Sequence, residues 1–74
     1  MKQQRCNPEL LYVIAQRIKQ LREERDVSQE MVYLDTNIHI GRIETGRSNI
    51  SVSTLQAICE YFDVNLPTFF QGIK

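Results

Sequence analysis

The stretch SQEMVYLDTNIHIGRIETG, residues 28–46, contains the start and stop signals of two short helices joined by a tight turn. Ser28 is a typical helix cap, because its hydroxyl oxygen can accept a hydrogen bond from a backbone amide two or three residues later. Gly46 is suited to the left-handed conformation that ends a helix, since it has no Cβ atom. The stretch therefore predicts one helix that ends near Asp35, a turn at Asn37, and a helix of about two turns from near His39 to Thr45.

Apolar residues recur at spacings of three and four on both sides of this stretch, as they do on one face of a helix. A first helix is expected from the Asn-Pro-Glu start at 7–9 to about Glu24. Ser51 caps a fourth helix, and Asn65 caps a short fifth one at 66–70. The side chains expected to face the core are Leu10, Leu11, Ile14, Ile18, Leu21, Met31, Val32, Leu34, Val52, Leu55, Ile58, Cys59 and Phe62.

These elements predict an all-α fold, a compact bundle of five short helices. The 74 residues suffice for one domain, expected at 7–74, and residues 1–6 have no periodicity and are expected to form a flexible tail. No apolar run approaches the roughly 18 residues that a membrane span needs, and the N-terminus is too polar for a signal peptide. We therefore expect a cytoplasmic protein.

The sequence contains little that could carry out catalysis. It has one histidine, no glycine-rich phosphate loop, and no nucleophile beside a base. Cys6 and Cys59 lack the spacing of metal ligands, so we interpret them as a tail thiol and an inert core thiol. The protein is expected to be no enzyme and to need no metal, cofactor or small-molecule ligand.

Three segments, IAQRIKQLREERDVSQE, IGRIETG and SVSTLQAICEYFDVNLPTFF, give the chain a recognisable overall pattern. From about Ile14 to Phe70 it resembles the XRE-type helix-turn-helix family of phage repressors, Cro proteins and restriction-modification controller proteins. The resemblance implies a lambda-repressor-like helix-turn-helix domain. It also implies a regulator that binds double-stranded DNA in a bacterial or phage-type setting.

The resemblance assigns roles to three polar residues. Arg22 and Glu44 match a pair that forms a buried salt bridge between the first and third helices in many relatives, and we interpret the pair as structural. Gln29 matches a glutamine that holds DNA phosphate or a base edge. A solvated first-turn residue is the alternative interpretation of Gln29.

The chain departs from the family in the middle of the motif. Ser28 to Gly46 takes 19 residues, three fewer than is usual, and the simplest alignment removes them just after His39, from the first turn of the reading helix. Tyr33 stands where relatives carry a small residue. We therefore hypothesise that the Tyr33 ring fills the space of the lost turn, so that Tyr33→Ala would leave a cavity costing several kcal/mol.

The candidate DNA surface combines the remaining helix with its flanks. Net charge is zero, but between Thr36 and Cys59 the only acid is Glu44. Arg42 is the best candidate to contact guanine O6 and N7, unless it is solvated or pairs with Asp35. The full set of candidate DNA contacts is Gln29, Asn37, His39, Gly41, Arg42, Thr45, Arg47, Ser48 and Asn49.

Several of these candidates have open alternatives. His39 could donate to a phosphate or a base, or could simply cap its helix. Gly41 would allow close approach of the duplex or of another helix. The segment 47–49 suits backbone phosphates, although a polar turn would have the same composition. Lys2 and Arg5 could add nonspecific attraction.

The C-terminal end is more apolar than a small monomer would expose. Leu66, Phe69, Phe70 and Ile73 are the expected homodimer contact; the alternative is that Phe69 closes the core and only Phe70 and Ile73 remain outside. The sequence thus predicts a dimeric, sequence-specific transcriptional regulator, most simply a repressor controlled by its own concentration. The alternative is a protein-interaction module on the same scaffold, for example an antitoxin.

Overall fold

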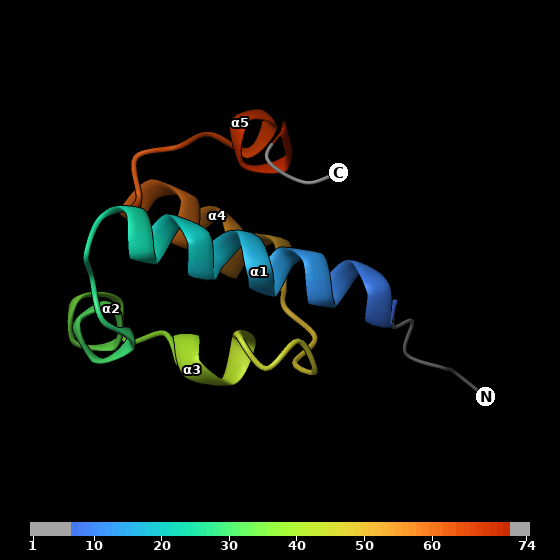
Figure 1. Ribbon diagram of the computed structural model, residues 1–74, viewed down its shortest axis with the longest axis horizontal. Helices are drawn as coiled ribbons and strands as arrows, with labels where there is room; N and C mark the ends of the chain where they lie inside the picture. Colours follow the sequence, from blue (N-terminus) through green and yellow to red (C-terminus); the bar gives the residue numbers. More distant parts are fainter. Residues whose placement is uncertain (1–6, 72–74) are drawn as a thin grey trace.

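A computed structural model of the chain describes residues 7–71, and the described residues form five helices and no strand (Figure 1). The helices are α1 (Pro8–Glu24), α2 (Gln29–Thr36), α3 (Ile40–Ile43), α4 (Val52–Tyr61) and α5 (Leu66–Gln71). The prediction of an all-α bundle is confirmed. The predicted tail at 1–6, with Lys2, Arg5 and Cys6, and the predicted contact residue Ile73 lie outside the described residues.

Side-chain caps set four of the helix starts. Each cap is an oxygen that accepts the backbone N–H three residues later and so satisfies a donor that the helix leaves unpaired. The caps are Asn7 for α1 at 3.1 Å, Ser28 for α2 at 3.0 Å, Ser51 for α4 at 3.0 Å and Asn65 for α5 at 2.8 Å.

The turns use residues that tolerate a left-handed backbone. Asp26, Asn37 and Asp63 have φ values of 55°, 63° and 59°, and Gly46 has 78°. A Cβ atom on Gly46 would lie 3.4 Å from the Tyr12 Cα atom. Gly46 thus gives α3 its end and allows the chain to pass close to α1.

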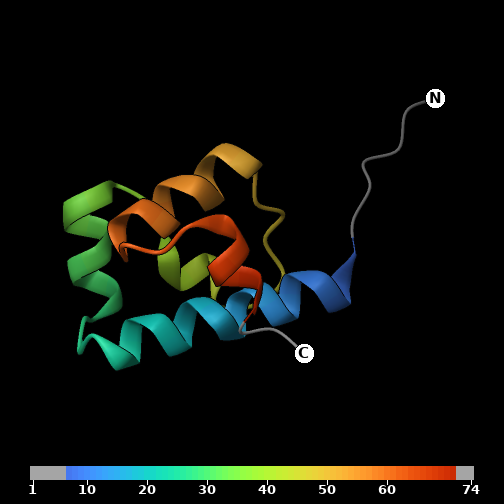
Figure 2. The same cartoon turned by 90° about the horizontal axis from the view of Figure 1, so that it is seen from above.

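The core is drawn from all five helices. In Figure 1, α2 and α3 lie on one side of α1 and α4, and α5 lies on the other; Figure 2 shows the same bundle from above. The buried cluster consists of Ile14, Ile18, Leu21, Val32, Ile40, Leu55, Ile58, Cys59, Phe62 and Phe69.

The sequence overestimated the core at four positions, since Leu10, Met31, Leu34 and Val52 are exposed. Leu10 and Met31 each precede an apolar residue, Leu11 or Val32, that takes the inward position instead. Successive residues of a helix point about 100° apart, so only one of two neighbours can face the core. Periodicity alone did not decide which one.

Arg17 fixes α5 against α1. Its Nε atom donates to the backbone oxygen of Phe69 at 2.8 Å, its Nη2 atom donates to that of Thr68 at 3.3 Å, and its guanidinium carbon lies 5.9 Å from the centre of the Phe69 ring. Carbonyls near the C-terminal end of a helix lack partners within it, and a cation there is favourable. Arg17 therefore supplies a contact that the sequence interpretation did not include.

Candidate nucleic-acid interface

The turn between α2 and α3 is held by short local hydrogen bonds. The Asn37 amide donates to the Tyr33 carbonyl at 2.7 Å. The Thr36 hydroxyl donates to the Val32 carbonyl at 2.7 Å and accepts from the Ile38 amide at 3.1 Å. These bonds fix the direction in which α3 leaves α2, and they place one face of α3 on the surface.

Arg22 and Glu44 form a bidentate ion pair that joins α1 to the end of α3. Arg22 Nε lies 2.7 Å from Glu44 Oε2, and Nη2 lies 3.1 Å from Oε1. Nη1 donates to the Val27 carbonyl at 3.1 Å. The Glu44 side chain is 5 % exposed, and its hydrogen bonds raise the pKa of Arg22 above the ordinary value. The one acid of the candidate surface is thus neutralised inside the protein.

Gln29 connects α2 to α3. Its Nε2 atom donates to Glu44 Oε1 at 2.9 Å, and its Oε1 atom lies 3.0 Å from the position that a Cβ atom on Gly41 would occupy. The side of Gly41 on which a Cβ would stand is therefore covered by the Gln29 side chain, and a larger residue at 41 would displace it. A phosphate contact from Gln29 remains a prediction.

Arg42 has no intramolecular partner among the described residues. It is exposed, and its guanidinium makes no hydrogen bond or ion pair within 7–71. The suggested pairing with Asp35 is wrong, because Asp35 Oδ2 instead accepts a 2.6 Å hydrogen bond from the Tyr61 hydroxyl. The N–H donors of the Arg42 guanidinium are therefore available to an acceptor outside the protein.

The Tyr61 hydrogen bond gives a prediction for alkaline titration. The bond to the Asp35 carboxylate raises the pKa of Tyr61 above its ordinary value of about 10. Because the pKa of Tyr61 is higher in the folded state than in the unfolded state, the bond stabilises the folded protein at every pH below the unfolded-state pKa. This stabilisation is lost as the pH rises through the folded-state pKa. Absorbance at 295 nm should therefore show a late phase of tyrosine ionisation that comes from Tyr61. Asp35→Asn should move that late step to lower pH, and an unchanged titration curve would contradict the contact.

The loop after α3 is polar and partly self-bonded. The Thr45 hydroxyl donates to the Arg42 carbonyl at 2.7 Å and accepts from the Arg47 amide at 3.3 Å. Arg47 and Asn49 are exposed and Ser48 is half-buried. The Arg47 guanidinium, like that of Arg42, has no ion pair with any described residue. The α3 face and this loop thus present two uncompensated positive charges.

Tyr33 and His39 stack across the α2–α3 turn. Their ring centres are 4.6 Å apart with the planes tilted by 34°, and His39 makes no side-chain cap bond to α3. The hypothesis that Tyr33 fills an internal space is wrong, since its side chain is 37 % exposed. Its ring covers the neighbouring imidazole instead of the core. Two aromatic residues six positions apart could have suggested the stack, but only with the turn geometry known.

The predicted self-contact at the C-terminal end is partly wrong. Phe69 is fully buried, so its ring belongs to the core and is not available to a partner. Leu66 is half-buried against the core, whereas Phe70 is 40 % exposed. The backbone of α5 turns Phe69 inward beneath Arg17, and its neighbour consequently points outward. Of the described residues named for this contact, Phe70 offers the most apolar surface.

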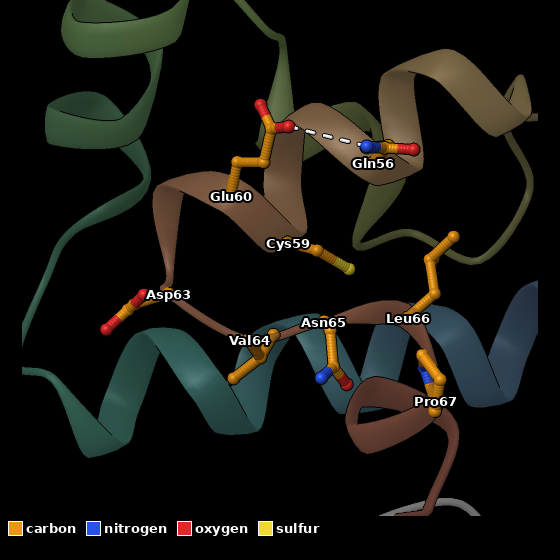
Figure 3. Close-up of a pocket in the computed structure, with 8 residues that line it drawn as sticks. All are labelled: Gln56, Cys59, Glu60, Asp63, Val64, Asn65, Leu66 and Pro67. Carbon is orange, nitrogen blue, oxygen red and sulfur yellow. Dashed lines mark hydrogen bonds between the residues drawn. The ribbon is translucent and has the colours of Figure 1, made fainter.

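An open hollow of about 620 Å³ lies between α4 and the segment leading into α5 (Figure 3). Gln56 and Glu60, joined by a 3.4 Å hydrogen bond, are among the residues that line it. Cys59 also lines it but is nearly buried, and desolvation raises the pKa of its thiol. A protonated thiol is a weak nucleophile, in keeping with a core residue.

Within 7–71, no group of three or more His, Cys, Asp or Glu side chains is placed to hold a metal ion. No helix in the same range combines the length and the apolar character that crossing a bilayer requires.

Comparison with known proteins gives one match. A family model described as helix-turn-helix matches residues 18–69, which include α2, α3 and α4 entirely and most of α5. No curated protein and no solved structure matched the chain.

Proposed function

Because the chain belongs to the XRE-type helix-turn-helix family of DNA-binding regulators, we propose that it recognises a specific operator as a homodimer and represses transcription. The observation that carries this proposal is the pair of guanidinium groups, Arg42 and Arg47, without ion pairs among the described residues. Glu44, the acid between them in sequence, is neutralised by Arg22. A chain of zero net charge thereby gains a locally positive surface for DNA.

The two arginines have different proposed roles. Arg42 lies on the recognition helix, where a guanidinium can donate two hydrogen bonds to O6 and N7 of guanine. Arg47 lies in the following loop with Ser48 and Asn49, where short polar side chains and a cation suit backbone phosphates. Phosphate contacts fix the position of the protein on the duplex, and base contacts supply the sequence preference.

Dimerisation is proposed because one short recognition helix meets only a few base pairs. Two copies related by a two-fold axis would bind half-sites about one helical turn apart. The exposed Phe70 ring on α5, with half-buried Leu66 beside it, supports a self-contact there. The proposed setting is the cytoplasm of a bacterial or phage-type system. There, the fraction of operator DNA that is bound would be set by the concentration of the protein itself.

Salt dependence tests the DNA interface. Affinity for duplex DNA is expected to fall linearly with salt on logarithmic axes, because each neutralised phosphate releases counterions. Arg47→Ala should reduce that slope by about 1 per subunit and weaken binding to all duplexes alike. Lys19→Ala removes the same charge from an exposed position on α1 and should leave the slope unchanged. Binding that is indifferent to salt would contradict the proposal and favour a protein partner.

The dimer has its own test. Phe70→Lys places a charge in the proposed contact and should convert the dimer into a monomer in analytical ultracentrifugation, because an unpaired charge is costly to bury. Val52→Lys is the matched control, since Val52 is 73 % exposed at the start of α4. A Phe70→Lys protein that sediments like the unaltered dimer would place the contact elsewhere.

A further inference from the structure

An aromatic pair marks the point where the chain turns into the recognition helix. Tyr33 lies in α2 and His39 directly precedes α3, with ring centres 4.6 Å apart. Both side chains are exposed, and neither ring makes a hydrogen bond to any described residue. The pair therefore contributes little to the core, and its polar atoms are free to meet a ligand.

The backbone around the pair is fixed on both sides. The Tyr33 carbonyl accepts from Asn37, whose left-handed conformation turns the chain. The His39 carbonyl accepts from the amides of Arg42 at 3.1 Å and Ile43 at 3.3 Å. His39 is thus tied to the first turn of α3, and Arg42 follows it by three residues, one turn along the same exposed face.

An exposed histidine ordinarily samples several rotamers, and binding that requires one of them costs side-chain conformational entropy. The Tyr33 ring lies against the imidazole, with the ring centres 4.6 Å apart and the planes tilted by 34°, and restricts that choice, while His39 remains exposed. An imidazole N–H can donate to N7 of a purine, an acceptor that every purine presents in the major groove.

We propose that Tyr33 is a positioning residue for DNA recognition, whose ring holds the His39 imidazole so that it donates to a purine N7 beside the base pair contacted by Arg42. The inference rests on the proposed DNA-binding function and extends it by a second base contact. Immobilising one rotamer-rich side chain on binding costs about a 2- to 12-fold loss of affinity, and the Tyr33 ring lowers this cost by ordering the imidazole before DNA binds.

The test measures affinity for the site that the unaltered protein selects from random duplexes. His39→Ala and Tyr33→Ala should each weaken binding within this range and relax the preference at the same base pair. The double variant should be no weaker than His39→Ala alone, because Tyr33 acts only through the His39 imidazole. Leu34→Ala is the matched control, as Leu34 is the exposed neighbour of Tyr33 on α2 and should leave the preference intact.

A spectroscopic measurement separates positioning from folding. The His39 ring protons should carry a ring-current shift in the NMR spectrum that disappears in Tyr33→Ala and persists in Tyr33→Phe, and Tyr33→Phe should retain the affinity. Tyr33→Ala with unchanged base preference, or losses that add in the double variant, would overturn the inference while leaving the proposed function standing. If the unaltered protein selected no site, both would fall together.

Discussion

Glu44→Ala is expected to destabilise the protein by about 3–5 kcal/mol, since it leaves the largely covered Arg22 side chain, 14 % exposed, without its counter-charge. Two hydrogen bonds, of 2.7 Å and 3.1 Å, would be lost, together with the acceptor of the Gln29 amide. A chain of this length has a stability of roughly 4–11 kcal/mol at 0.05–0.15 kcal/mol per residue. The substitution would therefore remove a large part of the stability, as measured by urea denaturation.

Two control variants identify the cause. Glu44→Gln keeps a carbonyl acceptor for Arg22 and should cost less than Glu44→Ala. Replacing both partners, as Arg22→Met with Glu44→Leu, removes the buried charges altogether and should restore much of the stability. A single Glu44→Ala variant within about 1 kcal/mol of the unaltered protein would show that the pair does not hold α1 and α3 together.

Phe69→Ala is expected to cost about 3–5 kcal/mol, the range for truncating a buried phenylalanine. The Phe69 ring is fully buried, contributes to the central cluster and lies beneath the Arg17 guanidinium. Phe70→Ala, one position later, should cost less than about 1 kcal/mol when measured at a concentration that keeps the protein monomeric. The difference between the two midpoints of denaturation tests the burial directly, and equal costs would contradict the orientation of α5.

Local chemistry explains which parts of the fold could be predicted. A cap such as Ser28 or Ser51 depends on residues within three positions, and a left-handed turn at Asn37 depends mainly on its own side chain. These features were predicted at the residues where they occur. The choice between Leu10 and Leu11 depended on how α1 rotates against the rest of the bundle, which no local pattern specifies.

The roles of Arg22 and Glu44 in the site could be predicted because the resemblance to a known family assigned them. Contacts that depend on the direction of a side chain in the folded protein could not be predicted in this way. The contacts of Arg17 with α5 span more than 50 residues, and the Tyr61 bond to Asp35 joins α4 to α2. Tyr33 was expected to fill a space inside the bundle and instead stacks on His39. Each of these contacts depends on how the helices pack in three dimensions, and the spacing of residues along the chain does not specify that packing.

The most direct test of the central claim is selection from random duplex DNA at moderate salt, comparing the unaltered protein with Arg42→Ala. We expect enrichment of a two-fold symmetric site, and a loss of about 1–3 kcal/mol in affinity for that site in Arg42→Ala. The preference for guanine should also relax at one position in each half-site. Failure of the unaltered protein to enrich any sequence, with only weak and salt-sensitive binding, would contradict sequence-specific recognition by α3.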